Sequence, residues 1–384
     1  MHKFKLLKDF DVKKKRVLMR VDFNIPLGDD KKISSNERWR IEAVLPTLKY
    51  LVEQNSKVIL ISHLGRPGGK RVDGLSLKPA AEELSVLLNK EVGFLEKTIG
   101  DEVNQRIEKM NWGDVLLLEN LRFLKEEKEN SEDFSKELAR FGDVYVNDAF
   151  SVSHRKHASV VGVVKFLSGC AGFLFEKEIK EFDKVLGFSE KPFVAVVGGA
   201  KISTKIGVIN KFLDLADNVL VGGALSNTIL AKEGCFMGES LVEECAEKIN
   251  TNNEKLILPV DFGVWNGKSS TYINIRNVEK GEKALDIGPK SIDLFSGFIK
   301  KAKLVVWNGP LGLVEKKPFD KSTTAIAKEI SNSQAYSVVG GGDTVAFLRK
   351  CGINKFDHIS TAGGAMLSYL ANETLPGIKA LEDF

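Results

Sequence analysis

The chain has 384 residues, of which 43% are hydrophobic and 28% are charged, and its formal net charge is +4. This length exceeds one ordinary hydrophobic core and suits two, while so small a charge argues against a general nucleic-acid or membrane surface. The segment MHKFKLLKDF lacks the apolar centre of a signal peptide, and no apolar run approaches a membrane span, so we expect a cytoplasmic protein that binds neither nucleic acid nor membrane.

In the first half of the chain, short apolar strands alternate with amphipathic helices, which predicts parallel sheets covered by helices. The predicted strands are RVLMRV (16–21), KVILIS (57–62), DVLLLE (114–119) and DVYVN (143–147). After the first strand, residues 36–54 have helical spacing, and the helix is expected to start after three candidate capping residues, Ser34, Ser35 and Asn36. Pro46 lies inside this helix and is expected to kink it.

A domain boundary is predicted near residues 168–190. There, residues 175–187 (FEKEIKEFDKVLG) have helical spacing and end at Gly187, which suits a helix that connects two lobes. The strands predicted beyond it are FVAVVG (193–198), NVLVG (218–222), LVVWN (304–308) and YSVVG (336–340). The predicted fold is therefore α/β, with two Rossmann-like lobes, each a parallel sheet flanked by helices, joined by a hinge helix.

Polar and basic residues follow the strands of the first lobe, at the sheet edge where α/β proteins bind ligands. They are Asp22, Phe23 and Asn24, then His63, Leu64, Gly65 and Arg66, then Arg122 and Arg155, with Arg38 at the start of a helix. Any one of these arginines alone would most often be a surface residue or an ion-pair partner. Four that converge would suit a small ligand with more than one anionic group.

Glycine turns follow the strands of the second lobe. They occur in GGAKISTK (198–205), GGALSNT (222–228), NGPLG (308–312), GGGDT (340–344) and TAGGAM (361–366). A single turn of this kind is as often a simple helix start as a phosphate site, but several in one lobe favour a nucleotide site. The P-loop pattern fails because Phe262 stands where it needs glycine, and a dinucleotide fingerprint fails at Val345.

Charged residues beside these turns fit a nucleotide with its metal. Asp343 could simply cap its helix, but next to phosphates a carboxylate is also a natural Mg²⁺ ligand, and Thr344 could add a hydroxyl contact. Lys201 and Lys205 lie four residues apart after two glycines, so one helical face would direct both ammonium groups to the same place.

The sequence offers neither a zinc site nor an obvious nucleophile. Four scattered cysteines form no C-x-x-C pair, and His154 and His157 lack a third metal ligand. This is consistent with phosphoryl transfer, which depends mainly on positioning and charge neutralisation. If the acceptor is a carboxylate, with a free pKa near ~4, no general base is required.

The residues also resemble a known family. RVDFNIPL, SHLGRPGG, LLLENLRF, YVNDAFSVSHRKHAS, VVGGAKISTKI, DIGPKS, VVWNGPLGLVE, VVGGGDTVAF and HISTAGGAMLSYL are similar, in this order, to motifs of phosphoglycerate kinases. The resemblance runs from about residue 16 to residue 381. It implies a two-lobed monomer that transfers a phosphoryl group reversibly between 1,3-bisphosphoglycerate and MgADP, giving 3-phosphoglycerate and MgATP in glycolysis or gluconeogenesis.

The resemblance also implies domain limits and roles. Residues 1–170 would bind the acid substrate, 171–187 would form the interdomain helix, 188–367 would bind nucleotide, and 368–384 would return to the first domain. Arg38 would stabilise the transferring phosphoryl group, with Lys201 opposite it. The other acid-binding residues would be Asp22, Phe23, Asn24, His63, Leu64, Gly65, Arg66, Arg122 and Arg155. The nucleotide residues would be Lys201, Lys205, Gly288, Asn308, Glu315, Gly341, Gly342, Asp343 and Thr344, with Glu315 on the ribose and Asp343 on Mg²⁺.

Three positions depart from the family pattern, because Ser151, Ser322 and Ala362 stand where glycine is common. None of them removes a charged contact. Two alternatives remain at this point: a two-domain protein that binds an anionic metabolite without chemistry, and a dehydrogenase. A binding protein would leave the glycine turns and Asp343 without a role. A dehydrogenase would need the dinucleotide-binding pattern, which is absent from the sequence.

Overall fold

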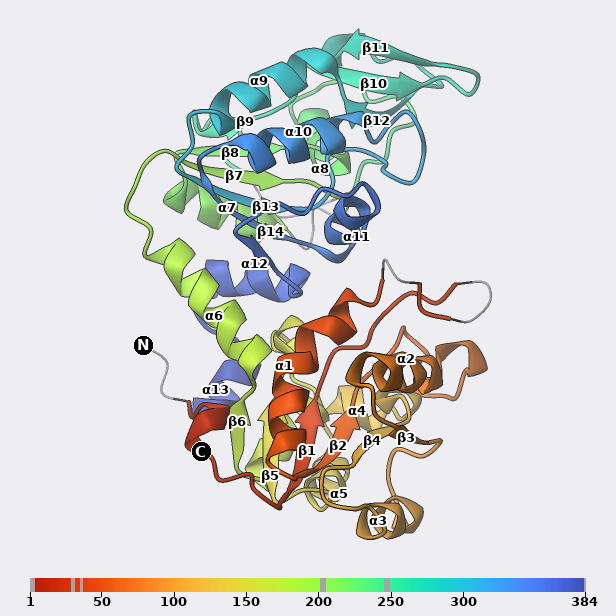
Figure 1. Ribbon diagram of the computed structural model, residues 1–384. Coiled ribbons are helices and arrows are strands. Elements are labelled where there is room, and N and C mark those ends of the chain that lie inside the picture. The colour runs from red at the N-terminus through yellow and green to blue at the C-terminus, as the bar shows by residue number, and fades with distance from the viewer. Residues whose placement is uncertain (1–3, 29–31, 35–36, 201–204, 245–248, 383–384) are drawn as a thin grey trace. The chain divides into compact units, whose positions relative to one another are not determined.

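A computed structural model describes residues 4–28, 32–34, 37–200, 205–244 and 249–382. The chain divides into two compact units, and each contains its own helix-covered sheet (Figure 1). Unit 1 comprises Met1–Glu181 and Asn372–Phe384, and unit 2 comprises Phe182–Ala371. Within the described ranges, no helix combines the length and apolarity that crossing a membrane requires.

Unit 1 is built on a six-stranded sheet with the order β3-β4-β2-β1-β5-β6, in which all neighbours are parallel. Its strands are β1 (Arg16–Arg20), β2 (Lys57–Ile61), β3 (Val92–Leu95), β4 (Val115–Leu118), β5 (Val144–Asn147) and β6 (Gly169–Ala171). Its helices are α1 (Trp39–Glu53), α2 (Lys78–Leu88), α3 (Asp101–Glu108), α4 (Glu126–Glu129), α5 (Glu132–Ala139) and, from the end of the chain, α13 (Pro376–Glu382).

The core of unit 1 follows from the alternation of side chains along its strands. Met19 of β1 and Leu60 of β2 face Leu48 of α1 and Leu84 of α2, and all four are fully buried. Figure 1 shows α1 and α2 together on one face of this sheet. Because the strands are parallel, their carboxyl ends lie at one edge of the sheet. The loops with the predicted acid-binding residues begin at this edge.

Unit 2 contains a second six-stranded parallel sheet, with the order β15-β14-β13-β7-β8-β9. Its strands are β7 (Phe193–Val197), β8 (Asn218–Val221), β9 (Leu256–Ile257), β13 (Leu304–Asn308), β14 (Tyr336–Gly340) and β15 (His358–Ile359). Its helices are α7 (Ile206–Leu215), α8 (Ala224–Lys232), α9 (Pro289–Ile299), α10 (Lys321–Asn332), α11 (Gly342–Lys350) and α12 (Gly363–Asn372). The core includes Trp307 of β13, packed with Phe295 of α9 and Ile326 of α10.

The eight strands predicted from the sequence are all present, with ends within one residue of those predicted. A three-stranded antiparallel sheet was not predicted; it comprises β10 (Asp261–Trp265), β11 (Ser270–Asn274) and β12 (Lys283–Ile287), in the order β11-β10-β12. One of its two outer strands, β11, is mostly exposed and has a weak apolar pattern. The structure therefore confirms the α/β class with two helix-flanked parallel sheets and adds a small antiparallel sheet to unit 2.

The start of α1 differs from the prediction. The helix begins at Trp39, and the residue before it, Arg38, makes no capping bond through its side chain. Ser34 lies in a preceding turn, where its carbonyl accepts a hydrogen bond from Glu37 N, whereas Ser35 and Asn36 fall outside the described residues. The helix continues through Pro46 without interruption.

The long helix at the predicted boundary is α6 (Phe173–Leu186), and the division between the units falls inside it. The backbone N–H groups of its first turn are satisfied by unit 1. Phe173 N donates to Thr47 Oγ1 at 3.1 Å, and Leu174 N and Phe175 N both donate to Asp148 Oδ1, at 2.9 and 3.1 Å. Asp148 therefore caps the helix from a fully buried position.

Burial raises the pKa of Asp148 from 3.8 to about 7, against the opposing effect of Thr47 and the two backbone donors. Because this pKa is raised in the folded state, the native protein holds the proton between pH 4 and 7 and loses stability as pH rises through that window. We expect the wild type to lose on the order of 4 kcal/mol relative to Asp148→Asn between pH 4 and 8. Urea unfolding of both proteins at several pH values measures this difference, and parallel pH curves would contradict the prediction.

Candidate active site

The polar residues after the strands of unit 1 gather as predicted. Asp22 to Asn24 follow β1, His63 to Arg66 follow β2, and Arg122 lies in the turn after β4. Because these strands are parallel neighbours, their carboxyl ends share one edge of the sheet. Arg66, Arg122 and Arg155 line one pocket of about 290 Å³, together with Pro67, Gly68, Lys128 and His157.

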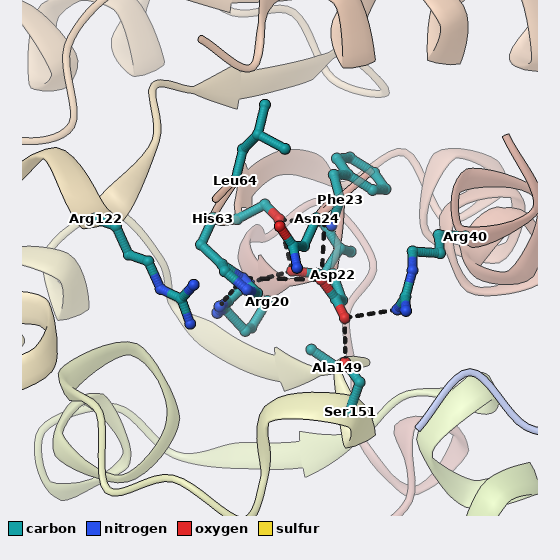
Figure 2. A network of polar contacts seen from close by, with 12 residues as sticks. Arg20, Asp22, Phe23, Asn24, Arg40, His63, Leu64, Arg122, Ala149 and Ser151 are labelled. Carbon is teal, nitrogen blue, oxygen red and sulfur yellow. Dashed lines mark hydrogen bonds and ion pairs between the residues drawn. The ribbon is translucent and has the colours of Figure 1, made fainter. Parts of the chain in front are cut away.

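Asp22 is the acidic centre of this edge (Figure 2). Its Oδ2 accepts hydrogen bonds from Arg40 Nη1, at 2.9 Å, and from the Ser151 hydroxyl. Its Oδ1 accepts the backbone N–H of Asn24 at 3.0 Å. Burial by itself would raise the pKa of Asp22, but Arg40, His63 and these hydrogen bonds together hold it well below 3.8. The carboxyl group is therefore ionised at neutral pH.

The loops around Asp22 are fixed by their own hydrogen bonds. Asn24 Oδ1 accepts from Gly65 N at 2.8 Å, and Phe23 N donates to Ser62 Oγ at 2.8 Å. Leu64 N donates to Asn120 Oδ1 at 3.2 Å. The first two bonds tie the loop after β1 to the loop after β2, and the third ties the loop after β2 to the turn after β4. Phe23, Leu64 and Gly65 therefore take part through their backbone N–H groups, and Asn24 through its side chain.

Arg122 lines the pocket from a buried position, and its Nη1 donates to Gly65 O at 2.6 Å. Burial, reinforced by Arg155 and Arg20, lowers the pKa of Arg122 to about 10. Burial likewise lowers the pKa of Arg155, with Arg20 and Arg66 contributing. Both groups remain charged at pH 7, so the pocket concentrates positive charge that an anion would neutralise.

Arg38 lies apart from the residues that line this pocket. Its Nε pairs with Glu42 Oε1 at 2.8 Å and its Nη1 with Glu83 Oε1 at 3.7 Å. The side chain is 38% exposed. The guanidinium is thus held by two carboxylates near the surface of unit 1, and it would have to exchange these partners to reach a ligand.

Four of the five predicted glycine turns of unit 2 gather, whereas the turn at residues 222–228 contributes no lining residue. The four turns line a pocket of about 380 Å³, which contains Lys205, Asn308, Gly341, Gly342, Asp343 and Thr344 of the predicted nucleotide residues. The other lining residues are Gly199, Ala200, Gly309, Pro310, Gly363, Gly364 and Leu367. Gly199 and Gly341 have φ values of +105° and +103°, which residues with a side chain rarely adopt.

Two of the predicted nucleotide residues bond to this framework. Thr344 is fully buried, and its Oγ1 accepts from Gly309 N at 3.1 Å. Asn308 Nδ2 donates to Gly363 O at 3.2 Å. These contacts connect the end of β13 to the starts of α11 and α12. The glycine loops are therefore held in a defined shape before any ligand binds.

Lys205 and Asp343 bring opposite charges to the pocket. Lys205 Nζ donates to Gly198 O at 2.5 Å, and burial lowers its pKa to about 8, with Asp343 acting in the opposite direction. Asp343 is exposed in the first turn of α11. The other predicted lysine, Lys201, lies outside the described residues.

The predicted Mg²⁺ site involves one carboxylate, that of Asp343. Within the described ranges no group of three His, Cys, Asp or Glu side chains could hold a metal ion. An exposed Asp343 beside glycine loops nevertheless fits Mg²⁺, which typically takes one or two protein carboxylates and completes its shell with substrate phosphates and water. The donor set is therefore suited to a metal that arrives with a nucleotide.

Two predicted nucleotide residues do not line the glycine pocket. Gly288 is buried directly before α9, where its N–H donates to Asp261 O at 2.9 Å. Glu315 is exposed in the loop after β13. Both follow strands of unit 2, so each remains a candidate for a more distant part of a nucleotide.

The departures from the family pattern have visible consequences. The Ser151 hydroxyl donates to Asp22, and the Ser322 hydroxyl donates to the buried Asp286. Burial raises the pKa of Asp286 to about 7, against the hydrogen bonds from Ser322. Ala362 is buried, and its N–H donates to Ser360 Oγ at 3.0 Å. Each serine thus adds a donor to a carboxylate at a strand end.

Several residues near the site were not predicted. Arg40 binds Asp22, and Lys128 lines the arginine pocket. Arg20 is fully buried at the end of β1, and Glu127 is fully buried on α4. Arg40 and Lys128 lie next to predicted motifs, but nothing in the spacing distinguishes them from other charged residues. Arg20 sits within a strand, where an alternating pattern gives no hint of a ligand site.

Comparisons with known proteins agree with this geometry. A family model described as phosphoglycerate kinase matches residues 7–373. The chain is 44% identical to the phosphoglycerate kinase of Finegoldia magna, over 99% of both chains, and 45% identical to that of Clostridium botulinum, over 99% of this chain and 98% of the relative.

Solved structures give the same result. The phosphoglycerate kinase of Pyrococcus horikoshii aligns with a TM-score of 0.88 and 34% identity, over 98% of both chains. That of Coxiella burnetii aligns with a TM-score of 0.79 and 36% identity, over 99% of both chains. With the arginine pocket in one unit and the glycine loops in the other, these matches show that the chain belongs to the phosphoglycerate kinase family.

Proposed function

We propose that this chain transfers a phosphoryl group reversibly between 1,3-bisphosphoglycerate and MgADP, with 3-phosphoglycerate and MgATP as products. One observation carries the assignment: the two units hold pockets with different chemistry, one lined by three arginines and the other by glycine loops beside an aspartate. Unit 1 would bind the acid and unit 2 the nucleotide. A binding protein without chemistry would have no use for the second pocket.

The residues of unit 1 would orient the acid by charge. The ionised Asp22 repels phosphate and suits the hydroxyl group of the ligand, whereas Arg66, Arg122 and Arg155 attract the phosphate that is not transferred. Arg38 would then neutralise the charge that develops on the transferring group. Because the acceptor is a carboxylate, already ionised near pH 7, the chain needs no base at this step.

The residues of unit 2 would hold the nucleotide phosphates. Backbone N–H groups at the start of α11 point out of the helix and carry partial positive charge, and Lys205 adds a full charge. Asp343 would hold Mg²⁺, which when bound neutralises the phosphate oxygens. We assign Lys201 to the transferring group, Gly288 to the nucleotide and Glu315 to the ribose. We further propose that the enzyme acts as a monomer in the cytoplasm.

A coupled assay tests the proposal. The purified chain is mixed with 3-phosphoglycerate, MgATP and a reporter dehydrogenase that consumes 1,3-bisphosphoglycerate with NADH. We expect steady loss of NADH absorbance that requires both substrates. Folded protein that gives no turnover would contradict the assignment, and calorimetry with each substrate alone would then show whether the chain only binds.

The arginine pocket predicts a role for Lys128. This exposed lysine lines the pocket, and no carboxylate in the described parts of the chain pairs with its ammonium group. One charge-assisted contact to phosphate typically contributes about 1 kcal/mol when partly exposed, so Lys128→Ala should raise KM for 3-phosphoglycerate about fivefold. KM for ATP should not change. Lys125→Ala, next to the same short helix but outside the pocket, is the matched control, and equal effects of the two would refute the role.

A further inference from the structure

A buried network of hydrogen-bonded polar groups lies next to the predicted acid site. It begins at Arg20, the last residue of β1, whose side chain is fully buried. Arg20 Nε donates to Ser159 Oγ at 2.9 Å, and Nη1 donates to the carbonyl oxygen of Val21. A buried guanidinium is rare in proteins unless it is paired, so this one requires a specific counter-charge.

Glu127 supplies that counter-charge through one hydroxyl group. Ser159 Oγ accepts from Arg20 and donates to Glu127 Oε1 at 2.6 Å, while Ser159 N donates to Glu127 Oε2 at 2.9 Å. Glu127 is fully buried, and Tyr145 OH donates to Ser159 O at 2.7 Å. The position of the Arg20 guanidinium is therefore set through Ser159, which Glu127 and Tyr145 hold in turn.

On its other side, the hydrogen-bond network includes His63. Arg20 Nη2 lies 3.1 Å from His63 Nδ1, and Figure 2 shows the two side chains side by side. A guanidinium can only donate, so Nδ1 must accept and carries no hydrogen. Asp22 Oδ1 lies 3.8 Å from the same nitrogen, too far for a hydrogen bond that would compete.

The charge of the ring follows from its surroundings. Burial lowers the pKa of His63 well below 6.5, and Arg20, Arg122 and Arg155 act in the same direction against Asp22. The ring is therefore neutral near pH 7. A neutral imidazole without hydrogen on Nδ1 carries it on Nε2. In the described parts of the chain, no residue accepts a hydrogen bond from His63 Nε2.

We propose that Arg20, anchored by Glu127 through Ser159, holds His63 in the Nε2–H tautomer, so that Nε2 donates a hydrogen bond to the anionic acid. Arg20, Ser159 and Glu127 are thus positioning residues that act through His63. This role rests on the proposed function for the identity of the ligand, but the tautomer itself is a property of the unliganded chain.

Nitrogen NMR of the full-length protein tests the tautomer directly. The chain is labelled with ¹⁵N-histidine, its long-range ¹H–¹⁵N spectrum is recorded at pH 7.5, and His63→Gln identifies the His63 signals. We expect a neutral His63 with its hydrogen on Nε2 alone. A charged ring, or hydrogen on Nδ1, would overturn the proposal whatever the enzyme assay gives.

Two variants then test the anchor. Ser159→Ala removes the hydroxyl that joins Arg20 to Glu127, and Glu127→Gln removes the charge while it keeps the shape. Each should give His63 signals from a mixture of tautomers and raise KM for 3-phosphoglycerate about three- to tenfold, with a smaller change in kcat. Combining either variant with His63→Gln should add little to KM, because both act through the same contact.

Ser135→Ala is the matched control. Ser135 is also a buried serine of unit 1, but its hydroxyl donates to Ser131 O and makes no link to Arg20. It should leave the His63 tautomer and KM unchanged. A merely structural role predicts a different pattern, in which Ser159→Ala lowers the unfolding temperature and leaves a single Nε2–H tautomer. If wild-type protein gave this tautomer but no turnover, the proposed function would fail while the positioning role stood.

Discussion

Replacing Arg38 with alanine is expected to lower kcat by roughly 10³-fold or more, because an arginine that neutralises a transferring phosphoryl group contributes about that much. The effect should fall on kcat rather than on KM for 3-phosphoglycerate, since this guanidinium lies apart from the arginine pocket and pairs with Glu42 and Glu83. Steady-state kinetics in both directions of the reaction measures the separate effects on kcat and on KM.

The fold should survive this change. Arg38 is 38% exposed, and exposed ion pairs contribute at most about 1 kcal/mol. Arg140→Ala provides the control, because Arg140 is also an exposed arginine of unit 1 and pairs only with Glu137 among carboxylates of the described chain. It should leave kcat unchanged. Arg38→Ala with more than a tenth of the wild-type kcat would show that another group stabilises the transition state.

Replacing Asp343 with asparagine is expected to lower kcat/KM for MgADP by about 10²-fold or more, because the metal would lose the carboxylate that we propose as its ligand. The side chain is exposed at the start of α11, so the substitution keeps its shape and removes at most about 1 kcal/mol of favourable interaction with the helix dipole. The free Mg²⁺ concentration that gives half-maximal rate should rise at least tenfold.

Titration of the rate with Mg²⁺ at fixed ADP measures this shift. Asp293→Asn, at an exposed position on α9 of the same unit, is the control and should behave as the wild type. KM for 3-phosphoglycerate should be nearly the same in all three proteins. An unchanged Mg²⁺ requirement in Asp343→Asn would assign Asp343 to helix capping alone.

The sequence predicted the parallel sheets well because their strands are short apolar runs that end in turn residues. β1 and β13, for example, are buried along almost their whole length, and continuous apolar runs of this length are typical of strands in parallel sheets that are covered on both faces. The antiparallel sheet was missed because β11 is mostly exposed and carries little apolar pattern. Its register depends on β10, with which it pairs.

The candidate site could be predicted only where its residues follow strands. Strand ends bring Asp22, His63 and Arg122 together, and that rule needs no side-chain geometry. The buried hydrogen-bond network of Arg20, Ser159 and Glu127 could not be predicted, because Arg20 and Ser159 are 139 residues apart and meet only in the folded unit. Likewise, the pattern could not show that Arg40, rather than its neighbour Arg38, would bind Asp22.

The last helix, α13, has a consequence for synthesis of the protein. It belongs to unit 1 although the whole of unit 2 precedes it, and Gly377 N donates to Ser153 O at 2.8 Å, two residues before Arg155. All of unit 2 is therefore synthesised before the last segment of unit 1. Domains, in contrast, usually fold in the order in which they emerge from the ribosome. Because α13 contacts the segment that carries Arg155, we expect a product interrupted within unit 2 to lack this support of the acid site.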